Sequence, residues 1–176
     1  MKPAAPLCDE ATEFLAKAMK NADGTSPNIL TTMAHHPKLM IHFSRMGGFL
    51  LNRGLVPARE REIVILRIGA NAGSVYEFGQ HTLIGSRNGL SDAEIAGLAA
   101  GDVGDGWADH EFDLIAMADE LCRDDCVSDA TFEKLQARWT EAELVELVLC
   151  AGFYRMVSGF LNTMGVSLDD GVPGWP

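Results

Sequence analysis

Basic residues are scarce in this chain. Its 176 residues include 14 lysines and arginines against 25 aspartates and glutamates, which gives a net charge of -11. A negatively charged surface repels phosphate backbones and anionic lipid headgroups, so neither nucleic acid nor a membrane surface is expected as a partner. The sequence also lacks any uninterrupted apolar stretch near ~20 residues, and residues 1–10 contain no apolar run. We therefore expect no membrane span, no secretory signal and a cytoplasmic location.

Cysteine is also rare, and no C-x-x-C pair occurs. The four cysteines are Cys8, Cys122, Cys126 and Cys150. A disulfide framework is not expected in a chain of this size without a secretory signal. No histidine lies near Cys122 and Cys126 at a spacing typical of zinc ligands, so no metal site is predicted there. We expect free thiols, and peroxide reduction by one of them remains an alternative function.

Strand-type alternation is nearly absent, whereas apolar residues recur every three to four positions along most of the chain. With 47% hydrophobic residues, the sequence predicts an all-α fold with a sizeable core, in a single domain spanning residues 1–176. A faint internal repeat aligns Glu62 with Glu146 and Ser74 with Ser158, which suggests duplication of a helical hairpin. Helices are expected at about 8–20, 28–34, 37–50, 57–72, 74–88, 91–99, 108–122, 128–139 and 140–164.

Three S/T-x-x-E patterns predict helix N-termini closed by a capping box, in which the first side chain binds the third backbone N–H and the glutamate binds back. They are Ser74 with Glu77, Ser91 with Glu94, and Thr140 with Glu143. For Glu77 this structural role competes with a chemical one.

The chemical role follows from spacing. Glu77 and His81 are four residues apart and share a helix face, where the carboxylate can orient the imidazole and raise its basicity. Glu62 stands in a mostly apolar helix, so its carboxylate is either paired or has a raised pKa. These three residues predict a general acid/base site. The alternative is a non-catalytic ligand-binding protein, in which Glu77 caps a helix, His81 fills the core and Glu62 pairs with Arg59 at the surface.

The segment from Leu55 to Leu98 contains P-A-x-x-R-E, I-L-R-I, Y-E-F-x-x-H and G-L-S-D-A-E-I. It resembles the carboxymuconolactone decarboxylase and alkylhydroperoxidase D family. The resemblance implies an alkylhydroperoxidase D-like fold of packed helical hairpins and a homo-trimer or homo-hexamer. The redox branch of that family uses Glu, two Cys and His, and the matching positions here are Glu62, Ser74, Glu77 and His81. Because both thiols are replaced, that thiol mechanism cannot operate at these positions.

The non-redox branch therefore resembles this chain better. It implies a decarboxylase or isomerase that works without metal or organic cofactor on a small carboxylated unsaturated lactone, or a related organic acid from aromatic catabolism. In that interpretation His81 transfers a proton, Glu77 orients His81, and Glu62 either is a second acid/base group or holds a bound water. The residues expected to bind substrate are Tyr76, Ser74 and Arg67, with Arg53 and Arg87 as further candidates for holding a carboxylate.

Overall fold

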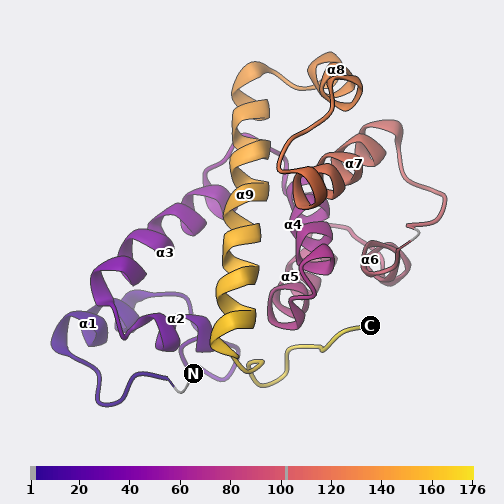
Figure 1. The fold of residues 1–176 in the computed structure, drawn as a ribbon. Coiled ribbons are helices and arrows are strands. Elements are labelled where there is room, and N and C mark those ends of the chain that lie inside the picture. Colours follow the sequence, from indigo (N-terminus) through magenta and orange to yellow (C-terminus); the bar gives the residue numbers. More distant parts are fainter. Residues whose placement is uncertain (1–2, 102) are drawn as a thin grey trace.

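The computed structural model describes residues 3–101 and 103–176, and this part of the chain is all-helical (Figure 1). The all-α prediction is confirmed. Met1 and Lys2, which belong to the N-terminal segment examined for a secretory signal, lie outside the described residues. The helices are α1 (Asp9–Lys17), α2 (Asn28–Met33), α3 (Pro37–Asn52), α4 (Ala58–Asn71), α5 (Val75–Arg87), α6 (Asp92–Ala99), α7 (Asp109–Asp124), α8 (Asp129–Arg138) and α9 (Glu141–Met164).

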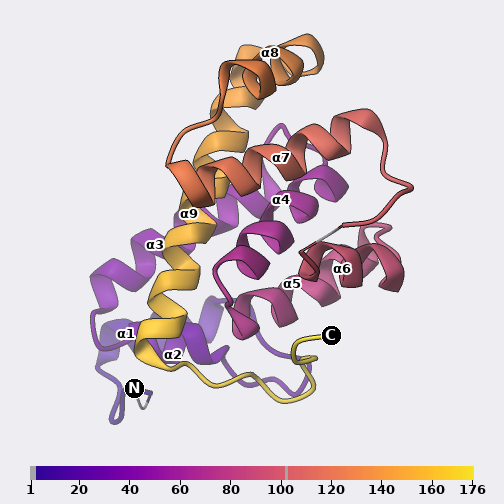
Figure 2. The same ribbon diagram turned by 45° about the vertical axis from the view of Figure 1, so that its right-hand side comes forward.

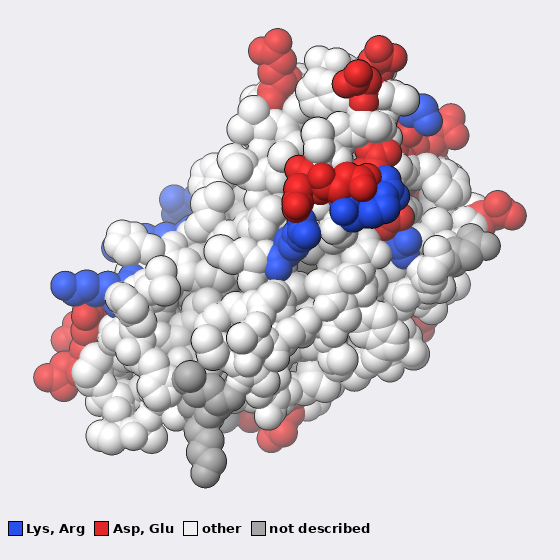
Figure 3. All heavy atoms as spheres, in the orientation of Figure 1, with Lys and Arg blue, Asp and Glu red and all other residues white. Residues whose placement is uncertain are grey.

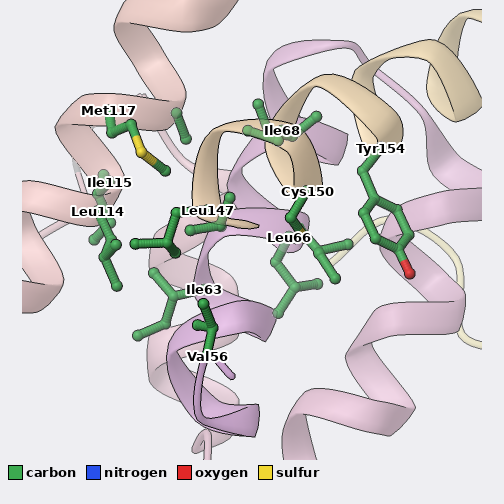
Figure 4. Close-up of a cluster of buried hydrophobic side chains, with 14 of the residues drawn as sticks. Val56, Ile63, Leu66, Ile68, Leu114, Ile115, Met117, Leu147, Cys150 and Tyr154 are labelled. Carbon is green, nitrogen blue, oxygen red and sulfur yellow. The ribbon is translucent and has the colours of Figure 1, made fainter. Parts of the chain in front are cut away.

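Helix α4 lies at the centre of the molecule and packs against α5, α6, α7 and α9 (Figure 2). Every residue from Arg61 to Gly69 is buried. A helix that is apolar on all sides has to be covered by neighbours, and the run Ile63 to Leu66 explains why α4 is central. Figure 4 shows Ile63 and Leu66 of α4 packed among side chains of α7 and α9, including Leu147.

Helix ends follow the sequence signals at two of the three predicted capping boxes. The boxes of Ser91 with Glu94 and of Thr140 with Glu143 are both formed. The Ser128 hydroxyl accepts the backbone N–H of Thr131 at 3.3 Å. Such caps satisfy backbone donors that a helix leaves free at its first turn.

Helix α9 runs unbroken from Glu141 to Met164, so the hairpin formed by α4 and α5 has no matching bend at Ser158. Glu146, the proposed counterpart of Glu62, has a different role. Its carboxylate accepts the backbone N–H groups of Leu55 and Val56 at 2.7 and 3.0 Å, which anchors the segment leading into α4.

By length and composition α9 could cross a membrane, but 50% of its most apolar window is buried inside the protein. Buried core helices pass the same test, and α9 packs against the central helix α4. Its outer side carries exposed apolar residues, including Val145, Leu149 and Met156. Figure 3 shows few charged side chains over the lower half of this helix.

The C-terminal segment (residues 165–176) crosses α5. The Trp175 ring packs on Phe78 with centroids 4.8 Å apart. The approach is so close at Gly79 that any Cβ there would clash with the carbonyl oxygen of Pro173. Glycine is therefore required at this position of α5.

Candidate active site

His81 lies between two carboxylates. Its Nδ1 is 2.6 Å from Oε2 of Glu62, and its Nε2 is 3.1 Å from Oε1 of Glu77. Glu62 comes from the first half of α4, whereas Glu77 and His81 share α5. A tight turn at Gly73, with φ of +59°, reverses the chain between the two helices and brings them together. The structure thus joins the three predicted acid/base residues.

The imidazole is charged in this setting. Burial opposes protonation, but the nearby carboxylates of Glu62 and Glu77 outweigh it and raise the pKa of His81 to about 10. Arg61 adds a second cation, with Nη2 at 3.1 Å from Oε1 of Glu62. Two positive and two negative groups therefore compensate one another inside the core, which a buried carboxylate requires.

The capping box predicted for Ser74 and Glu77 does not form. Ser74 is the N-cap residue of α5, yet its side chain accepts no backbone N–H. The Ser74 hydroxyl is fully buried and has no hydrogen-bond partner among the described residues. Glu77 faces His81 instead, because a charge-assisted contact with a buried imidazolium is stronger than a bond to a neutral backbone amide. The competing interpretation of Glu77 as only a helix cap is wrong.

A cavity of about 450 Å³ opens onto this cluster, between α1, α3, α5 and α9. Glu77 and His81 line it, and each is only 4% exposed, so they form its inner end. Glu62 is 0% exposed and lies behind His81, outside the lining. Tyr154 of α9 also lines the cavity and meets the His81 ring edge-on, with centroids 4.9 Å apart. Glu77 is thus the carboxylate that a ligand can reach.

Tyr76 lines the cavity as predicted for a substrate-binding residue, but its hydroxyl already donates a hydrogen bond within the protein. The hydroxyl donates to Oδ2 of Asp169 at 2.5 Å and accepts the backbone N–H of Ile29 at 3.2 Å. Burial, together with the Asp169 carboxylate, raises the pKa of Tyr76. Tyr76 therefore cannot donate a hydrogen bond to a substrate while its hydroxyl donates to Asp169.

Arg67 does not join the cavity, contrary to its expected role in substrate binding. Its guanidinium makes a bidentate contact with Asp119, at 2.6 and 3.0 Å, and donates to the carbonyls of Leu98 and Ala100. A fork of planar donors suits this set of oxygens, and it ties α4 to α7 and to the end of α6. Ser74 is likewise absent from the cavity lining.

The remaining arginine predictions are also corrected. Arg53 and Arg87 are not among the lining residues. Arg59 does not pair with Glu62 but with Glu94 and Glu111. The arginine that pairs with Glu62 is Arg61. Among the described side chains that line the cavity, Lys17 is the one lysine or arginine.

Several site residues were missed by the sequence reasoning. Arg61 adjoins Glu62 in sequence, a spacing that gave no reason to pair them. Lys17, Tyr154 and Asp169 come from α1, α9 and the C-terminal segment, which the acid/base motif does not reach. The sequence held no local signal for them, since their contacts are made through tertiary packing.

The thiols lie away from this chemistry. No cysteine lines the cavity within the described part of the chain. Burial, followed by the charge of Glu62, raises the pKa of Cys150 to about 12, and burial also raises the pKa of Cys122. Cys8 and Cys126 are exposed. In residues 3–101 and 103–176, no group of three or more His, Cys, Asp or Glu side chains could hold a metal ion.

Known proteins resemble this chain in both sequence and fold. Residues 37–120 match the carboxymuconolactone decarboxylase family. An uncharacterised peroxidase-related protein with an alkylhydroperoxidase AhpD core, from Ralstonia eutropha JMP134, is 21% identical with a TM-score of 0.80, over 94% of this chain and 88% of its own. A peroxidase-related protein from Silicibacter sp. TM1040 is 16% identical with a TM-score of 0.84, over 96% and 90%.

A protein of unknown function from Agrobacterium tumefaciens is 16% identical with a TM-score of 0.72, over 78% of this chain and 94% of its own. No functionally curated protein is significantly similar in sequence. The solved structures establish the alkylhydroperoxidase D-like fold. The segment that matches the carboxymuconolactone decarboxylase family contains Glu62, Glu77 and His81. Over residues 37–120 the chain is therefore similar to the carboxymuconolactone decarboxylase family.

Proposed function

We propose that the chain is a cofactor-independent acid/base enzyme, a decarboxylase or isomerase acting on a small carboxylated unsaturated lactone or a related product of aromatic catabolism. The observation that carries the proposal is the contact of His81 with two carboxylates, of which Glu77 lines a cavity. This cluster holds a proton on the imidazole and offers a carboxylate to a ligand, as proton-transfer chemistry requires.

Each residue then has a distinct role. Glu77 contacts the substrate, His81 exchanges a proton with Glu77 through Nε2, and Glu62 holds the imidazole at Nδ1. These roles differ from those expected from the sequence, in which His81 contacts the substrate and Glu77 orients His81. The change rests on both ring nitrogens of His81 being engaged by carboxylates.

Two reactions fit these roles. In a decarboxylation, the bond from the ring carbon to CO2 breaks and its electron pair enters the conjugated lactone as a dienolate. The proton that this carbon gains comes from His81 by way of Glu77, and solvent restores it. In an isomerisation, Glu77 removes a proton next to the carbonyl and returns it at another carbon, so that no atom is gained or lost.

Peroxide reduction by a thiol is less well supported. Two of the similar solved structures are peroxidase-related proteins. In this chain, however, the buried Cys150 and half-buried Cys122 have raised pKa values, which disfavours the reactive thiolate. The exposed Cys8 and Cys126 do not line the cavity.

We further propose that the protein is a cytoplasmic homo-oligomer, a trimer or hexamer, whose partner is a small organic acid or lactone and neither nucleic acid nor a membrane. The exposed apolar residues of α9, such as Val145, Leu149 and Met156, support self-association, because apolar surface of this kind is common at interfaces.

Ultraviolet absorbance with a panel of butenolide carboxylic acids tests the enzymatic proposal. Wild type is expected to turn over at least one acid, and Glu77→Gln to lose about 100-fold or more in rate while its circular dichroism stays unchanged. His81→Ala should also be inactive. Glu133→Gln, an exposed carboxylate on α8, is the matched control and should retain full activity. Wild type that neither turns over nor gains thermal stability with any acid would contradict the proposal.

A further inference from the structure

The charges around the cavity restrict its ligand. The walls between its two ends are mostly apolar and aromatic, including Phe14, Phe43, Leu51, Phe153 and Val157. Glu77 is the one Asp or Glu side chain among the described lining residues, and it lies at the inner end beside His81. An anionic group placed there would face the Glu77 carboxylate inside a poorly solvated pocket, which is unfavourable. The neighbouring His81 cation offers it no free donor, because both ring nitrogens already contact Glu62 and Glu77.

A cationic side chain that is not paired with any described carboxylate lies at the other end of the cavity. Lys17 is the last residue of α1, it is exposed and it lines the cavity. It has no acidic partner among the residues that the structure describes. The exposed Asn52 of α3 is another lining residue on the solvent side. A carboxylate can therefore be held at the solvent side, and the described lining residues include no arginine to hold a second one.

A third observation concerns Ser44 on the α3 wall. Its hydroxyl oxygen is buried and has no hydrogen-bond partner among the described residues, although it lines the cavity. Buried hydroxyls are normally satisfied, so an unpaired one in a cavity wall indicates a polar atom supplied by a ligand. A carbonyl oxygen is the group that accepts from such a donor without adding charge beside Glu77.

We propose that the substrate is a largely apolar unsaturated lactone or enone with a single carboxylate, which lies at Lys17 while the carbonyl end lies between Ser44 and Glu77. This inference rests on the proposed acid/base function and selects isomerisation from its two reactions, because the carboxylate is held away from the proton-transfer group. Glu77 removes the proton from the carbon next to the carbonyl, the electron pair moves into the carbonyl as an enolate, and protonation of the far carbon of the conjugated system returns the proton.

Three probes separate the charge requirement from the chemistry. They are a butenolide acetic acid with one carboxylate, its methyl ester, and an analogue with a second carboxylate on the ring. Affinity is measured by titration calorimetry, and proton abstraction is measured as exchange of the ring hydrogen with D2O by NMR. We expect the monoacid to bind about fivefold or more tightly than either analogue and to exchange its hydrogen.

Variants test the placement. Lys17→Gln should weaken binding of the monoacid to the level of the ester and leave the ester unchanged. Lys38→Gln, an exposed lysine outside the cavity lining, is the matched control and should bind all three probes like wild type. Ser44→Ala should weaken the monoacid and the ester equally, because the carbonyl is common to both.

The outcomes are distinguishable. A diacid that binds as tightly as the monoacid, or a monoacid that is insensitive to Lys17→Gln, would overturn the assigned ligand class even if exchange is seen. Binding that depends on Lys17 without any exchange would support the ligand class and contradict the acid/base function. Binding of none of the three probes would overturn the inference.

Discussion

Oε1 of Glu77 lies 3.1 Å from Nε2 of His81, on the side of the imidazole away from Glu62. Glu77 occupies the position at which a capping glutamate would turn back toward the start of its own helix. It turns along the helix axis instead, toward a buried cation. Glu77 thus makes a tertiary contact with His81 in place of a local helix cap. Because Glu77 lines the cavity, this contact connects the cluster to the cavity.

Stability should depend on pH through His81. The pKa of this residue is raised in the folded protein from an ordinary 6.5 to about 10 by the carboxylates of Glu62 and Glu77, against the effect of burial. A raised pKa means that the folded state binds the proton more tightly than the unfolded state. Its stabilising contribution is complete below pH 6.5 and is lost as the pH rises toward 10.

Urea denaturation between pH 6 and pH 10 measures this effect. The free energy of unfolding of wild type is expected to fall across that interval. His81→Gln should be less stable at pH 6 and should show a flatter profile. Parallel profiles for wild type and His81→Gln would show that the imidazole is not the group responsible.

Replacing Ser74 should reveal the missing cap. Since its buried hydroxyl has no partner, Ser74→Ala is expected to leave the free energy of unfolding unchanged or raise it slightly. Ser91→Ala is the matched comparison, because its capping box is formed, and it should lose about 1 kcal/mol. Equal losses in the two variants, measured by chemical denaturation, would mean that Ser74 caps α5 after all.

Arg67 should behave as a structural residue. Arg67→Lys keeps the positive charge but cannot reproduce the fork of contacts to Asp119 and two carbonyls, so a loss of about 2 kcal/mol in stability is expected. Affinity for butenolide acids should not change in the folded variant. A selective loss of affinity at unchanged melting temperature would restore Arg67 as a substrate-binding residue.

The C-terminal segment should be displaced by a single methyl group. Gly79→Ala introduces a Cβ that clashes with the Pro173 carbonyl, so the segment has to move and Trp175 should separate from Phe78. A red shift of tryptophan fluorescence and a lower melting temperature are expected. Gly159→Ala in α9 is the control, since nothing lies within 4 Å of its Cβ position, and it should gain about 0.5 kcal/mol.

The helices were largely predictable because most of their signals are local. Apolar spacing and the boxes at Ser91 and Thr140 each act within a few residues, and the structure follows them. The pairing of Glu77 with His81 could be proposed from their four-residue spacing. Whether Glu77 would cap or pair could not be decided locally, because both roles require a glutamate at the same position.

The rest of the site depends on contacts distant in sequence. The burial of His81 against Glu62, the position of Lys17 at the cavity and the commitment of Tyr76 to Asp169 are all set by helix packing. Arg67 illustrates the same limit in reverse. Arg67 was predicted to bind substrate because it lies near the acid/base motif in sequence. The 3.6-residue period of α4 instead directs its side chain toward α7.

The position of Asp169 after α9 has a consequence for biosynthesis. Its carboxylate orients Tyr76 and Gln80, two residues of the cavity wall, through bonds of 2.5 and 2.6 Å, and it also accepts the backbone N–H of Asn28 at 2.8 Å. On the ribosome, Asp169 emerges only after α1 to α9 have been translated. The three hydrogen bonds that hold this part of the cavity wall can therefore form only after every helix of the fold has been synthesised.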